Sequence, residues 1–546
     1  MSRDQIDSPR WTNPWADQPL WISIATWVGV LVPIVAAAVW ATRQSFLSGQ
    51  DRGLMELQVM DVFTTSTPLT GVYSRFGWHH PGPWPLWIMA VPYRLLGSSH
   101  GLLIAAAIAN LMAAVLLVMV LRRSMPSWMG MLSCIALLIV MHSFEGTGLA
   151  DPWNPWIAVL PAILAAVSTA FTFERYWFGL IGIASATFAS QSHIGFVPSM
   201  AAATLVALFW IIRPILRKDL SPSRAALRLL PVLGVLLLSW GPVAIEQFTH
   251  HPGNVSLLLE DAVNPPQQLD GDGHPVGRVT LDKAVDLVAQ QFSLDSAFAT
   301  HYPPVGQVDE ALGSQRWWLI WPTVCAVIGV VCWRRGSLPD RRYLVASWIQ
   351  VGVAILATSR LFGVVFPYQL AYGTVAVFLL LTATVWIAGA ALFKIDRTQP
   401  TFSALGVALI SVLAVTTIVD FRDAILPEQR HSEVMHALWP PALRRLNELG
   451  IDEVSIAPGP TPWLDVALGI GLRRSGLSEL SDGSARCTLT VRQLDDPVPD
   501  GWSTWSTWIA PSDDEVHGGL IRQYLEARVS TALLAGPGCV ESDDAV

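Results

Sequence analysis

Acidic, basic and imidazole side chains recur in the polar segments that separate long apolar runs of the sequence. The first such segment holds Asp51, Glu56, Asp61, Arg75, His79 and His80, and later ones hold Glu145, Asp151, Asn154, His193, Glu246, His250, His251, Arg360, Tyr368 and Tyr372. A carboxylate near lipid headgroups can act as general base on a hydroxyl group or hold a divalent cation such as Mg²⁺ or Mn²⁺. A nearby arginine or histidine can stabilise a phosphate leaving group. These residue types predict a site for a lipid-linked phosphate donor and a second, water-side substrate.

Each of these residues also has an ordinary structural explanation. Glu56 and Asp61 lie in "RGLMELQVMDVF", a helix-like stretch that would carry polar positions in any case. Asp151 opens "DPWNPW", where a helix N-cap and a site role are both plausible. His250 and His251 fit a solvated loop equally well. Asp51 and the adjacent His79 and His80 are the hardest to explain in this way.

The elements that must position these residues are membrane spans. Of the 546 residues 52% are hydrophobic and only 14% are charged, and apolar runs long enough to cross about 30 Å of hydrocarbon recur along the chain. They predict about eleven transmembrane helices: Trp21–Ala41, Gly101–Leu121, Ser127–Ser143, Trp153–Phe173, Tyr176–Ser190, Ile194–Ile212, Leu229–Ile245, Trp317–Trp333, Tyr343–Thr358, Tyr368–Phe393 and Thr401–Val419.

The distribution of basic residues predicts the orientation of these spans. With a cytoplasmic N-terminus (1–20) and an uncleaved first span, the cytoplasmic turns hold Arg122, Arg123, Arg175, Arg213, Arg217, Lys218, Arg224, Arg228, Arg334, Arg335, Arg341, Arg342, Lys394 and Arg397. A full span at Trp84–Leu96 would turn all of these outward. We therefore predict that Trp84–Leu96 is a helix lying in the outer interface. The polar segments that carry the candidate site then all face outward.

The same topology divides the chain into a transmembrane domain (21–419) and an extracytoplasmic tail (420–546). Within the first domain, 42–100 is an outer loop with the interfacial helix and 247–316 is a large outer loop. The tail alternates helical and strand patterns, in "ALWPPALRRLNELG", "EVSIAP", "WLDVALGIGLRRSG", "CTLTVRQ" and "EVHGGLIRQYLEARVSTALLA", which predicts a small α/β domain. Cys487 and Cys539 share this tail, and an oxidising compartment favours a disulfide between them over two separate thiols.

The order of these features resembles the GT-C superfamily of polyprenyl-phosphate-sugar glycosyltransferases, in particular its protein mannosyltransferase and aminoarabinose transferase branch. Asp51 stands where the family's acidic pair begins, although Arg52 replaces the second acid. "HPGPWPLW" stands at the family's "PPL" turn, with His79 and His80 where relatives have a lysine, and "YRLLGSSHGLLIAAAIANL" follows. Asp151 resembles the family's second acidic position. Arg360, ahead of "FPYQLAYG", resembles a late basic residue that contacts the donor phosphate.

The resemblance implies a GT-C-like helical bundle in a bacterial plasma membrane. It implies an inverting transfer of a sugar from a polyprenyl phosphate to a glycan, lipid or protein of the cell envelope. Asp51 would be the base, and Glu56 and Asp151 would support the acceptor or a cation. Arg75, His79, His80 and Arg360 would hold the phosphate, and the other polar residues would line the substrate cavity: Glu145, Asn154, His193, Glu246 and Tyr368.

Two other classes of function are weighed against this one. One is a signalling receptor, but no cytoplasmic output domain is predicted that would support it. No P-loop or dinucleotide-binding glycine motif is present, and nothing in the sequence indicates a nucleic-acid partner. A non-catalytic GT-C-like protein, acting as a lipid-linked-sugar transporter or an assembly scaffold, is the other hypothesis. A transporter is expected to carry charged residues in broken helices near the middle of the bilayer. The predicted spans hold few such residues, which favours the enzyme.

Overall fold

The structure is a computed structural model that describes residues 15, 18–44, 46–74, 76–144, 148–265, 268–269, 275–292, 319–362, 365–393, 400–421, 429–457, 462–479, 485, 487–493, 498–499, 502–508, 531–536 and 539. The chain forms two compact units. The membrane unit comprises Met1–Val39, Pro68–Ile88 and Ile104–Ala424. The C-terminal unit comprises Trp40–Thr67, Met89–Leu103 and Ile425–Val546.

All of the predicted spans coincide with helices. They are α1 (Leu20–Ala41), α4 (His100–Ser124), α5 (Ser127–His142), α6 and α7 (Asn154–Ile157 and Val159–Ala170), α8 (Tyr176–Ser192), α9 (Val197–Leu216), α10 (Pro222–Thr249), α15 (Ile320–Cys332), α16 (Leu338–Thr358), α17 (Ala371–Ala388) and α18 (Pro400–Asp420). Among the described residues, six helical segments are long and apolar enough to cross a bilayer: Leu20–Ala41, His100–Ser124, Ile194–Leu216, Pro222–Thr249, Tyr368–Ala391 and Ser403–Asp420. This confirms a polytopic helical fold.

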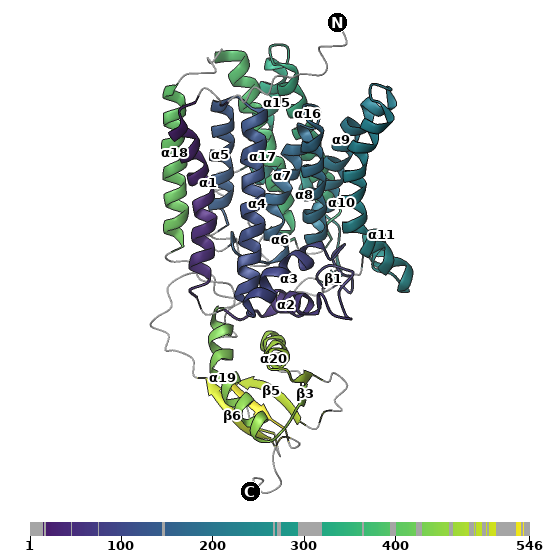
Figure 1. Cartoon of the computed structure of the whole chain (residues 1–546), viewed down its shortest axis with the longest axis vertical. Coiled ribbons are helices and arrows are strands. Elements are labelled where there is room, and N and C mark those ends of the chain that lie inside the picture. The colour runs from purple at the N-terminus through teal and green to yellow at the C-terminus, as the bar shows by residue number, and fades with distance from the viewer. Residues whose placement is uncertain are drawn as a thin grey trace. The chain divides into compact units, whose positions relative to one another are not determined.

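Helix α7 forms the core of the membrane unit. All of its residues are buried, and it packs against α8, α9 and α17 (Figure 1). Its sequence "VLPAILAAVSTA" is apolar or small on every side, as expected of a helix surrounded by other helices. The membrane unit also contains shorter elements: η2 (Ile194–Phe196), which directly follows His193, α11 (Asn254–Val263), α12 (Leu281–Gln290) and η4 (Pro367–Leu370), which includes Tyr368.

Arginines of the predicted cytoplasmic turns lie over aromatic rings within the membrane unit. The pairs are Arg122 over Trp15, Arg123 over Trp177, Arg213 over Trp210 and Arg342 over both Trp210 and Phe173, with the guanidinium carbon 4.5–5.6 Å from the ring centroid. A guanidinium over an aromatic face gains cation–π attraction while its charge stays near the helix end. The side of the membrane that these turns face stays a prediction.

Helix α3 (Trp84–Leu96) has the bounds predicted for the interfacial helix. It ends at Gly97, whose φ of +61° suits the residue after a helix terminus and whose N–H donates to the Tyr93 carbonyl at 2.9 Å. Its first residues belong to the membrane unit and the rest to the C-terminal unit. Its location at the outer interface of a bilayer stays a prediction.

The C-terminal unit contains the predicted α/β domain. Five strands form one sheet in the order β4 (Ser478–Glu479), β3 (Glu453–Ile456), β5 (Cys487–Gln493), β7 (Thr531–Ala535) and β6 (Ser503–Trp508). The β4–β3 and β3–β5 pairs are parallel, and the β5–β7 and β7–β6 pairs are antiparallel. Helices α19 (Gln429–Glu448) and α20 (Pro462–Arg474) pack on the sheet and bury a core that includes Leu438, Leu468, Leu489 and Leu533 (Figure 1).

Two features of this unit concern the sequence predictions. Cys487 and Cys539 form a disulfide with Cα atoms 4.5 Å apart, as predicted. The unit also includes α2 (Gln50–Asp61), which comes from the first polar segment and packs against α20. The tail therefore folds together with the segment that bears Asp51.

Candidate functional site

The two adjacent histidines lie on a tight hairpin-like loop of the membrane unit. The Gly71 N–H donates to the His80 carbonyl at 2.9 Å, and the His80 N–H donates to the Val72 carbonyl at 2.8 Å. A Cβ atom on Gly71 would lie 2.9 Å from the carbonyl oxygens of both His80 and Gly82, so the loop requires glycine there. The backbone on both sides of His80 is therefore fixed, and its ring points in a defined direction.

The ring of His80 lies beside that of His193, with the centroids 4.8 Å apart. The Ile194 N–H donates to His80 Nδ1, and the Gly195 N–H donates to His193 Nδ1, both at 3.1 Å. A nitrogen that accepts a hydrogen bond carries no proton, so the proton of each neutral ring lies on Nε2. Both rings are more than 90% buried.

Burial also determines the charge of this histidine pair. It lowers the pKa of His193 to about 4. It lowers the pKa of His80 well below the usual value, and a positive charge on His193 or His79 would lower it further. Near neutral pH the pair is therefore uncharged, and each ring has one Nε2–H group to donate.

An aromatic cluster extends from the histidine pair toward the start of α6. The ring of Tyr368 lies 6.2 Å from that of His193 and 5.0 Å from that of Trp153. The Trp153 N–H donates to Asp151 Oδ1 at 2.9 Å, a short-range contact of the kind that caps a turn. Asn154 Nδ2 donates to the Ser192 carbonyl at 3.2 Å. The predicted residues Asp151, Asn154, His193 and Tyr368 are thus brought together.

Two buried amides connect the histidine loop to α10 and α11. Gln191 accepts the Trp84 N–H at 3.0 Å and donates to the Ser239 carbonyl at 2.8 Å. Asn254 accepts the His79 N–H at 2.7 Å and donates to the His79 carbonyl at 2.9 Å.

Glu246 is buried next to the start of α11. Both of its carboxylate oxygens accept the Asn254 N–H, at 3.1 and 3.0 Å. This helix end favours negative charge, which accounts for a carboxylate at that place.

Other predicted residues of the membrane unit are exposed or lie outside the described residues. Arg360 is exposed at the end of α16, and the neighbouring Leu361 carbonyl accepts the Val279 N–H at 3.0 Å. His250 and His251 are exposed. Arg75 and Glu145 lie outside the described residues, so their predicted roles stay predictions.

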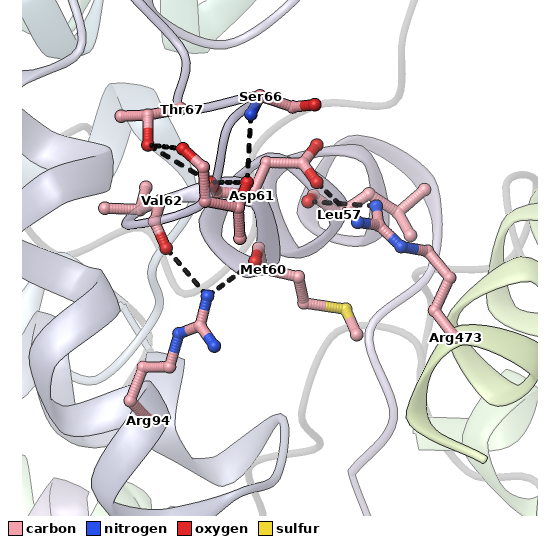
Figure 2. Close-up of polar contacts among 9 residues, drawn as sticks. Leu57, Met60, Asp61, Val62, Ser66, Thr67, Arg94 and Arg473 are labelled. Carbon is pink, nitrogen blue, oxygen red and sulfur yellow. Dashed lines mark hydrogen bonds and ion pairs between the residues drawn. The ribbon is translucent and has the colours of Figure 1, made fainter. Parts of the chain in front are cut away.

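The acidic residues of the first polar segment belong to the C-terminal unit. Asp51 is exposed in the first turn of α2. Glu56 is fully buried and forms an ion pair with Arg474. Asp61 forms an ion pair with Arg473, which Figure 2 shows. Within the described part of the chain, no three His, Cys, Asp or Glu side chains form a group that could hold a metal ion. The predicted divalent cation stays a prediction.

Several residues of these networks were not singled out from the sequence. Gln191, Asn254 and Arg474 have no role in the sequence predictions. A single buried amide leaves no periodic signal, because its partners are backbone groups of distant segments. A polar residue at the end of an apolar run is the one signal that could have drawn attention to Gln191.

Comparisons with known proteins bear on the fold. No protein-family model matches the sequence, and no curated protein matches it at a significant level. The apo structure of ArnT from Cupriavidus metallidurans matches with a TM-score of 0.50 at 10% identity, covering 94% of this chain and 98% of that chain. The structure of ArnT bound to undecaprenyl phosphate matches over the same fractions of the two chains, with a TM-score of 0.48 at 11% identity. The chain therefore has the fold of ArnT, the GT-C-like fold that the sequence resemblance predicted.

Proposed function

We propose that this chain is a membrane glycosyltransferase. It takes a sugar from a polyprenyl phosphate and transfers it, with inversion, to a cell-envelope glycan, lipid or protein on the outer face of a bacterial plasma membrane. The observation that carries the proposal is the fold shared with apo ArnT over 94% of the chain. The orientation proposed with it has a cytoplasmic N-terminus and an extracytoplasmic C-terminal domain.

The donor phosphate is proposed to bind at the histidine pair. ArnT binds undecaprenyl phosphate, and we infer the same class of lipid here. His80 and His193 each have an Nε2–H group to donate while the rings stay neutral. Donors fixed in advance in a site that excludes water stabilise charge on a phosphate oxygen without reorganising. Arg360, and Arg75 as predicted from the sequence, would supply positive charge.

Asp51 is proposed as the general base. The acceptor hydroxyl oxygen attacks the anomeric carbon, and the proton passes to the Asp51 carboxylate. The bond from that carbon to the phosphate oxygen breaks, and its electron pair leaves with the polyprenyl phosphate. A single displacement of this kind inverts the configuration at the anomeric carbon. Asp151 stays a candidate for holding the acceptor or a divalent cation, whereas the oxygens of Glu56 already accept hydrogen bonds from Arg474, Tyr93 and Ser99.

The experiment is an assay of transfer in membranes supplied with polyprenyl-phosphate sugars. Asp51→Asn should lower transfer by on the order of 10²-fold or more, the usual contribution of a general base. Asp452→Asn is the matched control, because Asp452 is an exposed carboxylate of the same unit. Transfer by Asp51→Asn at the rate of the control would contradict the assignment of the base.

A further inference from the structure

Glu56 is a fully buried carboxylate whose partners come from two other segments of the C-terminal unit, Met89–Leu103 and Ile425–Val546. Tyr93 Oη donates to Oε1 at 2.8 Å, and Ser99 Oγ donates to Oε2 at 2.7 Å. The Arg474 guanidinium pairs with Oε1 and lies 2.6 Å from Ser99 Oγ. A buried carboxylate is tolerated only when it is paired and hydrogen-bonded, so this network defines where α2 lies in the unit.

The ionisation of the partners keeps this network intact around neutral pH. Burial, and to a smaller extent the negative charge of Glu56, raises the pKa of Tyr93 to about 12. The Tyr93 hydroxyl therefore keeps the proton that it donates. Burial alone would lower the pKa of Arg474, but the Glu56 carboxylate and Tyr93 outweigh it and the net change is upward. Arg474 is therefore a permanent cation at this place.

A second set of contacts holds the C-terminal end of α2. Figure 2 shows Arg473 of α20 directed at the Asp61 carboxylate, and its Nη1 also donates to the Leu57 carbonyl at 3.4 Å. On the other side, Arg94 Nη2 donates to the Met60 and Val62 carbonyls at 2.8 and 2.7 Å. Carbonyls of a last helical turn lack partners within the helix, and cations suit that end of the helix dipole.

Close packing reinforces these polar contacts. A Cβ atom on Gly53 would lie 2.7 Å from Val466 Cγ1 of α20, so the two helices approach each other at this glycine. Ahead of α2, Ser432 Oγ accepts the Leu47 N–H at 2.8 Å and donates to the Leu47 carbonyl at 3.0 Å. The domain thus contacts α2 at its start, middle and end.

The contacted face of α2 is different from the face that bears Asp51. Glu56 follows Asp51 by five residues, which turns it about 140° around a helix of 3.6 residues per turn. Glu56 is buried, whereas Asp51 is exposed. Asp51 itself stays exposed in the first turn, whereas the neighbouring Arg52 is buried.

We infer that Arg474 is a positioning residue for the transfer reaction: through Glu56 it holds α2 in the orientation that presents Asp51 to the acceptor. This inference rests on the proposed function, since Asp51 is the proposed base. It gives the C-terminal domain a role in the chemistry without contact between that domain and the substrate.

The test compares Arg474→Ala and Arg474→Lys with Arg445→Ala in the full-length protein. Arg445 is the matched control, because it forms an exposed ion pair with Glu448 in the same domain. Hydrogen exchange of the α2 amides measures whether the helix is held, and transfer kinetics measure kcat and the KM for the donor. Exchange in the strand β5 peptide shows whether the sheet stays folded in each variant.

In Arg474→Ala the α2 amides should exchange at least ~10-fold faster, because local opening becomes easier. The kcat should fall on the order of 10²-fold, the cost of misplacing a reacting group by about 1 Å, with the donor KM unchanged. Arg474→Lys keeps the charge and should recover part of the lost kcat. Arg445→Ala should stay within about twofold of wild type.

Two outcomes would overturn the inference alone, and a third would overturn the proposed function with it. If the wild-type protein transfers sugar and Arg474→Ala keeps the wild-type kcat, the positioning role alone is wrong. The same holds if hydrogen exchange of the α2 amides is no faster in Arg474→Ala than in wild type. If the wild-type protein shows no transfer from any polyprenyl-phosphate sugar, the proposed function is wrong and the positioning role falls with it.

Discussion

The two units bury polar side chains in different ways. In the membrane unit His80, His193 and Asn254 are neutral, and their partners are mainly backbone groups. In the C-terminal unit Glu56 and Arg474 are charged and pair with each other. This difference determines what each network can do. The two neutral rings accept hydrogen bonds through Nδ1, so their Nε2–H groups can still donate to a ligand. The Glu56 carboxylate accepts from a guanidinium and two hydroxyls, and these contacts stabilise the fold.

The largest expected effect on stability comes from separating the charged pair. Arg474→Met leaves the Glu56 carboxylate buried without its cation, which should lower the free energy of unfolding by about 3 kcal/mol. Denaturant unfolding of the purified protein measures this value. The double variant Glu56→Gln/Arg474→Met should recover most of the loss, because the remaining amide can still hydrogen-bond to Tyr93 or Ser99. A double variant as unstable as the single one would contradict this assignment.

The membrane unit should instead show a pH effect. The folded state holds His193 with a pKa of about 4, below the usual 6.5, so the unfolded chain binds the proton first on acidification. The stabilisation is fully present above about pH 6.5 and is lost as the pH falls toward 4, by on the order of 3 kcal/mol. Thermal unfolding between these pH values checks it. His193→Asn should make the profile shallower while His80 keeps its own contribution, and His250→Asn, at an exposed site, should leave the profile unchanged.

The smallest expected effects come from one kind of contact that occurs in both units, a side chain that bonds to both backbone groups of a distant residue. Asn254 bonds to both backbone groups of His79, and Ser432 bonds to both backbone groups of Leu47. Asn254→Ala should cost about 2 kcal/mol and Ser432→Ala about 1 kcal/mol, as each leaves backbone groups without their partner. Only Asn254→Ala should also weaken donor binding, because it releases the histidine loop. Equal donor binding by the two variants would remove the functional distinction between the units.

The elements of this fold were predictable because their signals are local. The bounds of α3, the predicted spans, strands β3 and β5 and the Cys487–Cys539 pair all follow from periodicity, length and composition. The α2–α20 association was not predictable in this way. Arg474 and Glu56 are 418 residues apart, and nothing in either local pattern specifies the other.

The candidate site was predictable only in part, for the same reason. The choice of His80, His193, Asp151 and Tyr368 rested on polar residues at the ends of apolar runs, and these residues do come together. Their protonation did not follow from the sequence, because it depends on which backbone N–H each ring accepts. Glu56 shows the converse: a conspicuous acid in the expected segment whose observed contacts hold two segments of the unit together.

The proposed donor site at the histidine pair can be tested by the binding of undecaprenyl phosphate, measured by native mass spectrometry with undecaprenol as the comparison. Wild-type protein should prefer the phosphate, and His80→Ala/His193→Ala should weaken this binding at least ~10-fold through the loss of two donated hydrogen bonds. Arg474→Ala should bind undecaprenyl phosphate as wild type does. Equal binding of undecaprenol, or phosphate binding that the histidine substitutions leave unchanged, would rule out the donor site proposed at this pair.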